Sequence, residues 1–171
     1  MVALIGDIIR LSQLDEGEEM PREDVDLLEV ARRATEQLDT TAQARKIAVT
    51  VDGQPTAVNG VRQLLYEVIY NLCDNAIKYN VDKGSVDVRV GTQDGAAQVT
   101  VSDTGIGIPV QDQDRVFERF YRVDKSHSKA SGGTGLGLSI VKHAVQYHHG
   151  KIDLQSAPGK GTTIRVLLPA G

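Results

Sequence analysis

Apolar residues recur at three- and four-residue steps between residues 61 and 76, which predicts an amphipathic helix. At about 100° per residue, Glu67, Asn71, Asn75 and Lys78 fall within an arc of roughly 80° beside the apolar face. Asparagine is a mediocre helix former, so two of them in one stripe ask for a reason. Helix-face asparagines without a function are also common, so this helix alone favours a binding site only slightly.

The same reading predicts helices on either side of this one. Residues 1–15 carry a helical apolar stripe, and its abrupt start suggests the end of a longer helix. An acidic break follows at 16–21, and a second helix is expected over 27–44. A third helix is expected from about residue 136 to 149, with Gly150 ending it.

Alternating or short apolar runs predict the strands. They lie at residues 22–26, 47–51, 57–58, 86–90, 97–101, 152–154 and 164–168. Asp94-Gly95 predicts a hairpin turn, and Asn59 is a candidate cap for the helix that starts near Val61. Strands adjacent in the chain should mostly pair antiparallel. We therefore expect an α/β (α+β) two-layer sandwich, with a mixed sheet of about five strands and three main helices on one face.

Composition limits the classes of function. The chain has 171 residues, 40% of them apolar and 25% charged, which fits one globular domain. A net charge of −4 gives no sign of a nucleic-acid surface, and no apolar run is long enough to span a membrane. The single cysteine, Cys73, excludes an internal disulfide and fits a reducing compartment.

Two glycine-containing segments are candidates for ligand binding. Asp103 continues the inward face of its strand, where a buried carboxylate needs a donor such as the amine of adenine, or a bond within its own turn. Residues 132–138 run straight into a helix, whose free amides would bind an anion. The run does not follow an apolar strand and has no Gly-Lys-Ser/Thr ending, so it fits neither a dinucleotide fingerprint nor a P-loop.

The long polar stretch 104–131 has one amphipathic island at 116–122, and such loops are usually functional lids or disordered. Arg122 lies in that island and is as consistent with phosphate contact as with a solvated loop charge; for Lys125 we favour the solvated charge. The histidines show no metal-ligand spacing. They also lack the neighbours expected of a phosphoryl acceptor; they are His127, His143, His148 and His149.

Four segments, in this order, resemble motifs of the catalytic ATP-binding domain of two-component sensor histidine kinases. Asn-Leu-x-x-Asn-Ala-Ile-Lys-Tyr at 71–79, Asp-Thr-Gly-Ile-Gly-Ile at 103–108, residues 116–122 and Gly-Thr-Gly-Leu-Gly-Leu at 133–138 resemble its N, G1, F and G2 boxes. Residues 156–162 match as well, and the similarity extends over residues 22–168. The resemblance implies the Bergerat fold of the GHKL superfamily.

The resemblance also implies roles for individual residues. Asn75 would hold a Mg²⁺ ion on the phosphates of ATP with support from Asn71, and Asp103 would accept the adenine amine. Asn71, Lys78 and Arg122 would take part in catalysis, with Arg122 acting on the γ-phosphoryl group. The implied binding residues are Asn71, Asn75, Lys78, Tyr79, Asp103, Gly105, Gly107, Ile108, Arg122, Thr134, Gly135, Leu136, Gly137 and Leu138.

The implied activity is transfer of the γ-phosphoryl group of ATP to a histidine of a dimerisation domain. In the related gyrase and chaperone ATPases, a glutamate stands where this chain has Asn71 and activates water. An amide cannot take that proton, so slow hydrolysis is expected, and Glu67 is a weaker candidate base. Two alternatives remain open: a stand-alone ATPase of the same superfamily, and an interaction module that binds no nucleotide.

The resemblance divides the chain. Residues 1–17 resemble the end of the second helix of a dimerisation hairpin, and residues 18–171 the catalytic domain, with an ATP lid at about 107–134. The acceptor histidine is expected on the hairpin, so autophosphorylation needs that segment as a partner and involves a response regulator only indirectly. We expect this piece to be monomeric, to make no direct membrane contact, and to be the cytoplasmic part of a larger sensor.

Overall fold

The computed structural model describes residues 2–15, 20–113, 115–118 and 137–169 of the chain, and the side chains of residues 8–14 in the first of these ranges. The elements, in chain order, are α1 (Val2–Asp15), β1 (Glu23–Asp26), α2 (Leu27–Gln37), α3 (Asp39–Ala44), β2 (Ala48–Gly53), β3 (Ala57–Gly60), α4 (Arg62–Lys78), β4 (Ser85–Gln93), β5 (Ala96–Asp103), α5 (Val110–Gln113), α7 (Gly137–Tyr147), β6 (Lys151–Ser156) and β7 (Thr162–Pro169).

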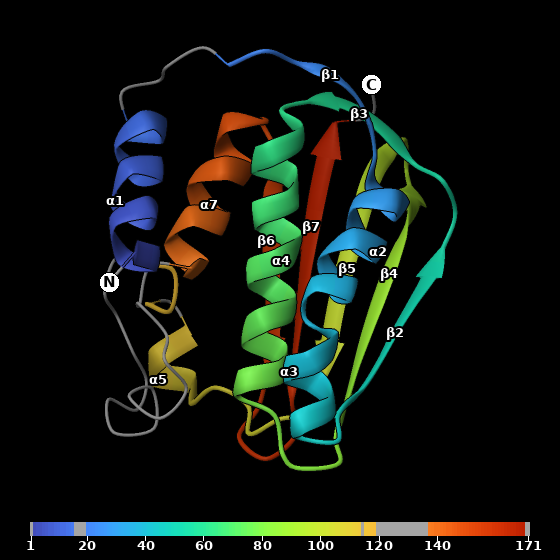
Figure 1. The fold of residues 1–171 in the computed structure, drawn as a ribbon, viewed down its shortest axis with the longest axis vertical. Coiled ribbons are helices and arrows are strands. Elements are labelled where there is room, and N and C mark those ends of the chain that lie inside the picture. Colours follow the sequence, from blue (N-terminus) through green and yellow to red (C-terminus); the bar gives the residue numbers. More distant parts are fainter. Residues whose placement is uncertain (1, 16–19, 114, 119–136, 170–171) are drawn as a thin grey trace.

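Five strands form the main sheet in the order β2-β4-β5-β7-β6. β2 runs parallel to β4, and the other neighbours are antiparallel. Helices α2, α4 and α7 cover one face of this sheet, while α1 lies alongside α7 (Figure 1). β1 and β3 form a separate two-stranded sheet. The predicted two-layer α/β sandwich with a mixed five-stranded sheet is confirmed.

The core lies between the sheet and the helices, because the apolar faces of the strands and of the helices pack against each other there. On β4 and β5 every second residue is buried, and on α4 the buried residues recur at three- and four-residue steps. The buried residues of these three elements are Leu64, Leu65, Val68, Ile69, Leu72, Cys73, Ala76, Ile77, Val86, Val88, Val90, Ala97, Val99 and Val101. The end of β5 therefore lies at the edge of the core, beside the last turns of α4.

The predicted hairpin turn is confirmed. Asp94 and Gly95 have φ angles of 53° and 80°, the left-handed pair that a two-residue turn between twisted strands requires. The helix expected over 27–44 instead breaks at Leu38 into α2 and α3. Near that break the Thr35 hydroxyl bonds back to the carbonyl oxygens of Ala31 and Arg32, a contact that bends helices.

The expectation that Asn59 caps α4 is wrong. Asn59 pairs with Asp24 inside β3, and α4 has no side-chain cap from its own N-terminal residue, Val61. Instead, the imidazole Nε2 of the buried His148 accepts the Val61 N–H at 3.0 Å, while its Nδ1 donates to the Ala144 carbonyl at 2.8 Å. Burial lowers the pKa of His148, which favours the neutral ring that this bond needs.

Helix α7 ends at Tyr147, three residues before the predicted terminating glycine, Gly150. His149 takes the left-handed conformation, with a φ of 61°, and the Gly150 N–H closes the turn onto the Val145 carbonyl at 2.9 Å. No helix in the described part of the chain is both long and apolar enough to cross a membrane.

Candidate functional site

Helix α4 presents the polar stripe beside its buried face. Asn71 and Asn75 are half-buried, one turn apart, and next to the buried Leu72 and Ala76. Among the described residues, none hydrogen-bonds to either side-chain amide. Two amide oxygens at the edge of the core are therefore available to a ligand.

The Asp103 carboxylate lies at the end of β5 on the inward face that the alternation predicts. Its Oδ1 accepts the backbone N–H of Gly105 at 2.8 Å and that of Thr162 at 3.2 Å. Within the described residues these are the partners of the carboxylate, so Oδ2 keeps its lone pairs for a ligand. Burial raises the pKa of Asp103 to about 6, against the two amide hydrogen bonds that lower it.

The glycines after Asp103 let this loop lie against neighbouring backbone. A Cβ on Gly105 would stand 2.4 Å from the carbonyl oxygen of Tyr79, at the end of α4. Gly107 has a φ of 75°, and a Cβ there would stand 2.0 Å from the Ala157 carbonyl oxygen. The Ile106 N–H also donates to the Tyr79 carbonyl at 3.1 Å, which fastens the loop to α4.

The turn between β6 and β7 braces the loop from the other side. The Ile108 N–H donates to the Ser156 hydroxyl at 2.8 Å, and the Gln113 side chain of α5 donates to the carbonyl oxygens of both residues at 2.9 Å. The Gly159 N–H donates to the Ile106 carbonyl at 2.8 Å. Residues 156–162 therefore hold the loop in place.

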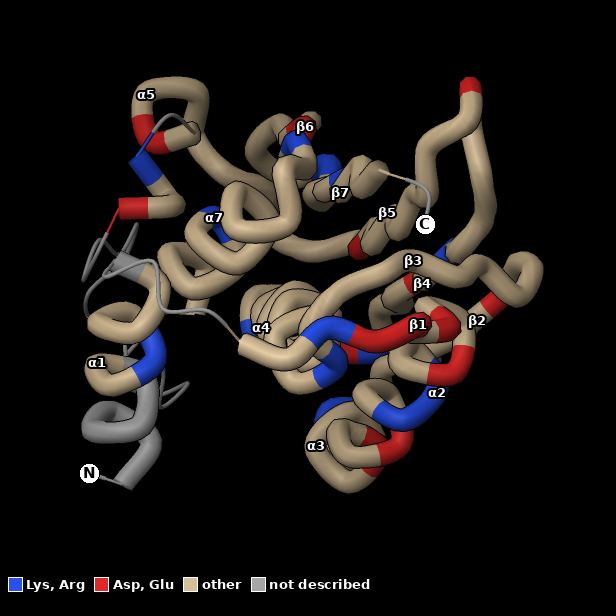
Figure 2. Tube along the Cα trace, turned by 90° about the horizontal axis from the view of Figure 1, so that it is seen from above, with Lys and Arg blue, Asp and Glu red and all other residues tan. Residues whose placement is uncertain are grey.

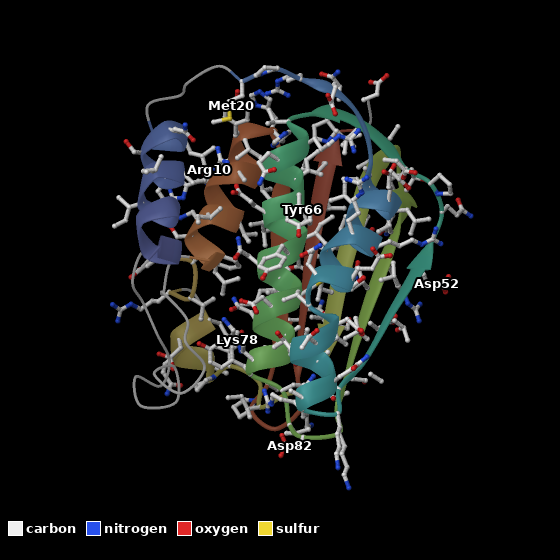
Figure 3. The ribbon with its side chains drawn as sticks, in the orientation of Figure 1. Arg10, Met20, Asp52, Tyr66, Lys78 and Asp82 are labelled. Atoms are coloured by element: carbon white, nitrogen blue, oxygen red, sulfur yellow. The ribbon has the colours of Figure 1, made fainter. Side chains whose placement is uncertain are left out.

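Lys78 ends the polar stripe of α4. Its Nζ lies 3.0 Å from Asp74 Oδ2, and the two side chains are 23% and 19% exposed. Figure 3 labels Lys78 at the end of α4 nearest α5. The ammonium group therefore has a counter-ion one turn back on its own helix.

Glu67, at the other end of the stripe, contacts α1. Its Oε2 lies 2.8 Å from Arg10 Nε, and the side chains of Arg10 and Glu67 are 21% and 24% exposed. Glu67 lies one helical turn before Asn71, so this ion pair engages the carboxylate that was the weaker candidate base.

The start of α7 approaches the same stripe. A Cβ on Gly137 would stand 3.2 Å from Asn71 Oδ1, and Leu138 packs against the core. The first turn of a helix has N–H groups without helical partners and the positive end of the helix dipole. The structure therefore brings three segments, around residues 71–79, 103–108 and 137–138, to the same half of α4.

Several predicted site residues fall outside the described residues. They are Arg122, Thr134, Gly135 and Leu136, together with most of the predicted lid. Tyr79, Ile108 and the remaining glycines of the prediction lie in the region just described. Of the predicted amphipathic island, the structure describes Val116–Glu118, in which Val116 is buried.

Two grooves lie elsewhere on the described surface. One, of about 410 Å³, lies between α2 and α4 and includes Arg33 and Tyr66. The other, of about 760 Å³, lies on the sheet face opposite the helices and includes Arg89 and Arg165. None of the predicted site residues lines either groove. The junction at the end of α4 is therefore where the candidate residues gather.

Comparison with known proteins agrees with this geometry. The family described as histidine kinase-, DNA gyrase B-, and HSP90-like ATPase matches residues 60–171, which include all three converging segments. The chain belongs to this family. The sequence-based resemblance to the catalytic ATP-binding domain of sensor histidine kinases is thereby confirmed.

Individual relatives are sensor kinases. The chain is 43% identical over 169 residues to the sensor-like histidine kinase SenX3 of Mycolicibacterium smegmatis, covering 97% of this chain and 44% of that protein. It is 34% identical over 173 residues to the sensor histidine kinase WalK of Bacillus subtilis, covering 99% of this chain and 28% of that protein. The chain therefore spans less than half the length of these relatives.

Solved structures share the fold. The mycobacterial sensor histidine kinase MprB aligns with a TM-score of 0.77 at 35% identity, covering 88% of this chain and 98% of that chain. Full-length ShkA, solved in complex with AMPPNP, aligns with a TM-score of 0.85 at 23% identity, covering 99% of this chain and 35% of that chain. At that identity the second likeness shows the fold alone.

The sequence reasoning missed residues that support this ATPase-family site. Asn80 is buried, and its side chain joins Val81, Ser85 and the Thr104 hydroxyl. Arg45 reaches the end of α4 from another part of the chain. Asn80 directly follows the predicted site residue Tyr79, so its place in the chain could have marked it as part of the site. Nothing in the sequence distinguishes Arg45 from a surface arginine.

The described residues fit a magnesium nucleotide better than a bare metal. No group of three His, Cys, Asp or Glu residues that could hold a metal ion occurs in the part of the chain that the structure describes. The side-chain oxygens of Asn71 and Asn75 are ligands of the kind Mg²⁺ accepts, but the ion usually takes most of its ligands from phosphates and water. The two amide oxygens alone would leave a divalent ion short of ligands, which the phosphates of a nucleotide could supply.

Proposed function

We propose that this domain binds Mg-ATP and donates its γ-phosphoryl group to a histidine of a dimerisation domain in two-component signalling. The observation that carries the proposal is the convergence of the Asp103 loop and the start of α7 on the last turns of α4. The Ile106 N–H of the Asp103 loop bonds to the Tyr79 carbonyl at 3.1 Å, and a Cβ on Gly137 would stand 3.2 Å from Asn71 Oδ1.

Recognition of the purine rests on Asp103. Its Oδ1 is held by two backbone amides, which orients Oδ2 as the acceptor for the amine of adenine. Gly105 and Gly107 would line the flat ring, because their loop backbone is held close to Tyr79 and Ala157. Tyr79 would flank the ring from the end of α4, and Ile108 would line the site where the Asp103 loop ends.

Binding of the phosphates rests on α4 and α7. The amide oxygens of Asn75 and Asn71 would hold the magnesium ion, and Lys78 would contact phosphate. The ion supplies charge neutralisation on the phosphate oxygens. Amides at the start of α7 would hold the phosphate chain, together with Thr134, Gly135, Leu136, Gly137 and Leu138. Arg122 would act on the γ-phosphoryl group from the lid, about residues 107–134.

Asn71 favours transfer over hydrolysis. Its amide cannot accept a proton from water at neutral pH, and Glu67, the next acidic residue along the stripe, is paired with Arg10 at 2.8 Å. The phosphoryl group would therefore be kept for a histidine. We assign the acceptor to the dimerisation hairpin, of which residues 1–17 would be the end, and place the domain, residues 18–171, in the cytoplasm with a response regulator as indirect partner.

Calorimetric titration with a non-hydrolysable ATP analogue tests the binding. We expect saturable binding in the presence of Mg²⁺ and weaker binding when the metal is chelated. The binding-competent domain should then label a separately supplied dimerisation hairpin on histidine when given radiolabelled ATP. Absence of analogue binding would support the alternative of a nucleotide-free interaction module.

The variant Asn71→Glu separates the kinase from a stand-alone ATPase. A carboxylate at this position supplies the missing base, so acceptor-free hydrolysis should rise by about tenfold or more, because general-base catalysis is worth at least that much. Asn71→Gln, which restores no base, is the matched control. Appreciable hydrolysis by the unaltered domain, left unchanged by Asn71→Glu, would favour the ATPase reading.

A further inference from the structure

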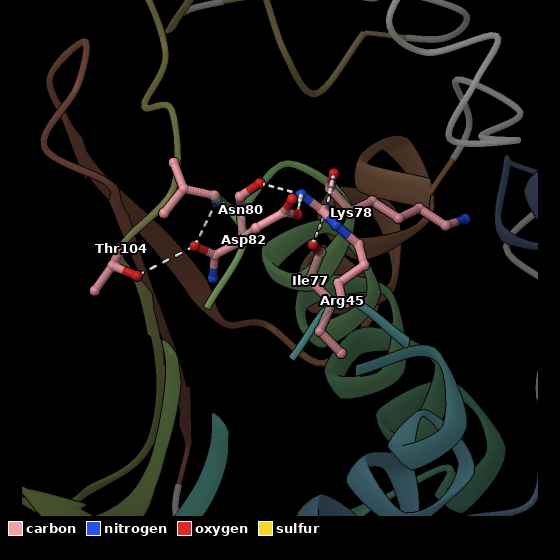
Figure 4. Close-up of polar contacts among 7 residues, drawn as sticks. Arg45, Ile77, Lys78, Asn80, Asp82 and Thr104 are labelled. Atoms are coloured by element: carbon pink, nitrogen blue, oxygen red, sulfur yellow. Dashed lines mark hydrogen bonds and ion pairs between the residues drawn. The ribbon is translucent and has the colours of Figure 1, made fainter. Parts of the chain in front are cut away.

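Arg45 clamps the C-terminal end of α4 (Figure 4). Its Nη1 donates to the carbonyl oxygens of Ile77 and Lys78, each at 2.6 Å, and its Nη2 donates to that of Asn80. The last carbonyls of a helix have no helical partner and carry the negative end of the dipole. One guanidinium group therefore binds three carbonyl oxygens at the end of α4, of which only that of Ile77 also accepts a backbone N–H there, that of Asn80 at 3.3 Å, among the described residues.

The backbone around Arg45 is itself fixed. Arg45 ends α3, and the next residue, Lys46, has a φ of 58°. The Ile47 N–H donates back to the Ala42 carbonyl at 2.9 Å, and Ile47 is buried. The Arg45 carbonyl oxygen accepts the Lys83 N–H at 3.3 Å. The guanidinium therefore reaches α4 from a rigid turn rather than from a mobile arm.

The clamped turn carries the Asp103 loop. Its Tyr79 carbonyl accepts the Ile106 N–H at 3.1 Å and stands against the Gly105 backbone. The Asn80 side chain accepts the Thr104 hydroxyl at 3.1 Å (Figure 4). Both contacts lie within three residues of Asp103, so they join this turn to the segment that carries the carboxylate.

We propose that Arg45 is a positioning residue for the purine end of the site: it fixes the turn at residues 77–80 and, through that turn, the Asp103 loop. The inference rests on the proposed function, because it names what the clamp positions. Arg45 makes no contact with Asp103 itself, so its effect is indirect. Loss of the clamp lets the last turn of α4 fray, and the loop then loses its support.

The test compares Arg45→Met with Arg62→Met by calorimetric titration of adenosine, ADP and the Mg²⁺ complex of a non-hydrolysable ATP analogue. Arg62 begins the same helix and pairs with Glu23 on the surface, so the control makes the same charge change at the opposite end. Arg45→Met should lower the affinity for each of the three ligands by a similar factor of about ten, because all three contain the purine. Arg62→Met should leave them within about twofold.

Arg45→Lys keeps the charge but cannot reach three carbonyls from one planar group, so its loss should be intermediate. Hydrogen exchange at the Ile106 amide should be faster in both Arg45 variants than in the unaltered domain. If Arg45→Met does not fold at the titration temperature, Arg45→Lys and its exchange rate provide the test.

A folded Arg45→Met domain with unchanged affinities would overturn the inference, and so would a loss confined to the triphosphate. Unchanged exchange at Ile106 in a folded Arg45 variant would do so as well. If the unaltered domain binds none of the three ligands, the proposed function fails instead. The exchange prediction then still shows whether the clamp positions the loop.

Discussion

At the purine end of the proposed site the ligand-facing groups are held by backbone, whereas at the phosphate end they are side chains on one helix. Asp103 is fixed by two amides, and its loop bonds to Tyr79. Asn71 and Asn75 have no side-chain hydrogen-bond partner among the described residues, and Lys78 pairs with Asp74. In the proposed site, the Asp103 loop is therefore already held in place, while Lys78 would have to exchange Asp74 for a phosphate.

This contrast follows from the chemistry of the two halves of a nucleotide. A flat ring with a fixed pattern of donors is best met by a rigid surface, because ordering it at the moment of binding costs affinity. A phosphate chain with its cation is recognised mainly by charge, which tolerates flexible side chains. Changes at the purine end should therefore act on folding and affinity together, and changes at the phosphate end on affinity alone.

The largest expected effect is that of Gly161→Ala. Gly161 has a φ of 80°, and a Cβ there would stand 2.0 Å from the Asp103 carbonyl oxygen. The left-handed conformation and the clash should together cost about 3 kcal/mol of unfolding free energy. Chemical denaturation measures this, and nucleotide affinity should fall as well.

Gly159→Ala is the matched control. Its φ of 77° is almost the same, but no atom lies within 4 Å of the added methyl group. Gly159→Ala should lower the unfolding free energy by only about 1 kcal/mol, from backbone strain alone. Equal losses in the two variants would mean that the close approach to Asp103 is not what Gly161 provides.

Asp103→Asn should come next, with a loss of affinity that exceeds any loss of stability. Its Oδ1 can keep both amide hydrogen bonds, but an NH₂ group then faces the amine of adenine. The affinity for adenosine should fall by about thirtyfold, which corresponds to about 2 kcal/mol for a lost charged hydrogen bond. Titration calorimetry measures it, and unchanged affinity would remove Asp103 from purine recognition.

The pH dependence of stability gives this variant a second readout. Burial raises the pKa of Asp103 to about 6, above its unfolded value of 3.8. Its contribution to stability is therefore fully present below pH 3.8 and is lost as pH rises through about 6. Asparagine does not titrate, so the variant does not lose this contribution. As pH rises from 4 to 8, the unfolding free energy of Asp103→Asn should therefore increase by about 1 kcal/mol relative to that of the unaltered domain, allowing for solvent screening.

The parts of the fold that follow from local periodicity could be predicted from the sequence. The hairpin at Asp94-Gly95 and the buried face of α4 are decided within a few residues, and both are confirmed. The cap of α4 could not be predicted, because His148 supplies it from 87 positions away. The break at Leu38 was missed for a different reason, since a helical apolar pattern continues across it.

The candidate site shows the same division. Asp103 and its glycines form one short segment, so their grouping is visible in the sequence. Arg45 is not, because its partners are carbonyl oxygens, which every residue has. The Lys78–Asp74 pair was predictable, since oppositely charged residues four apart on a helix are neighbours. It was missed because Lys78 was considered only with phosphate.

That pair gives the smallest expected effect. The Asp74 carboxylate competes with phosphate for Lys78 and adds a negative charge beside the proposed phosphate position. Asp74→Asn removes both, so affinity for the magnesium-bound triphosphate analogue should rise by about fivefold, as for roughly 1 kcal/mol from one charge pair. Affinity for adenosine, which has no phosphate, should not change.

The matched control is Asp87→Asn, which breaks an ion pair with Arg89 next to the groove on the opposite face of the sheet. It changes the net charge by the same amount. A rise in triphosphate affinity shared by both variants would therefore reflect only the long-range attraction between the less negative domain and the phosphates. A fall in triphosphate affinity in Asp74→Asn would mean that Asp74 aims Lys78 at the ligand instead of competing for it. The phosphate end would then be preformed like the purine end, and the contrast between the two would not hold.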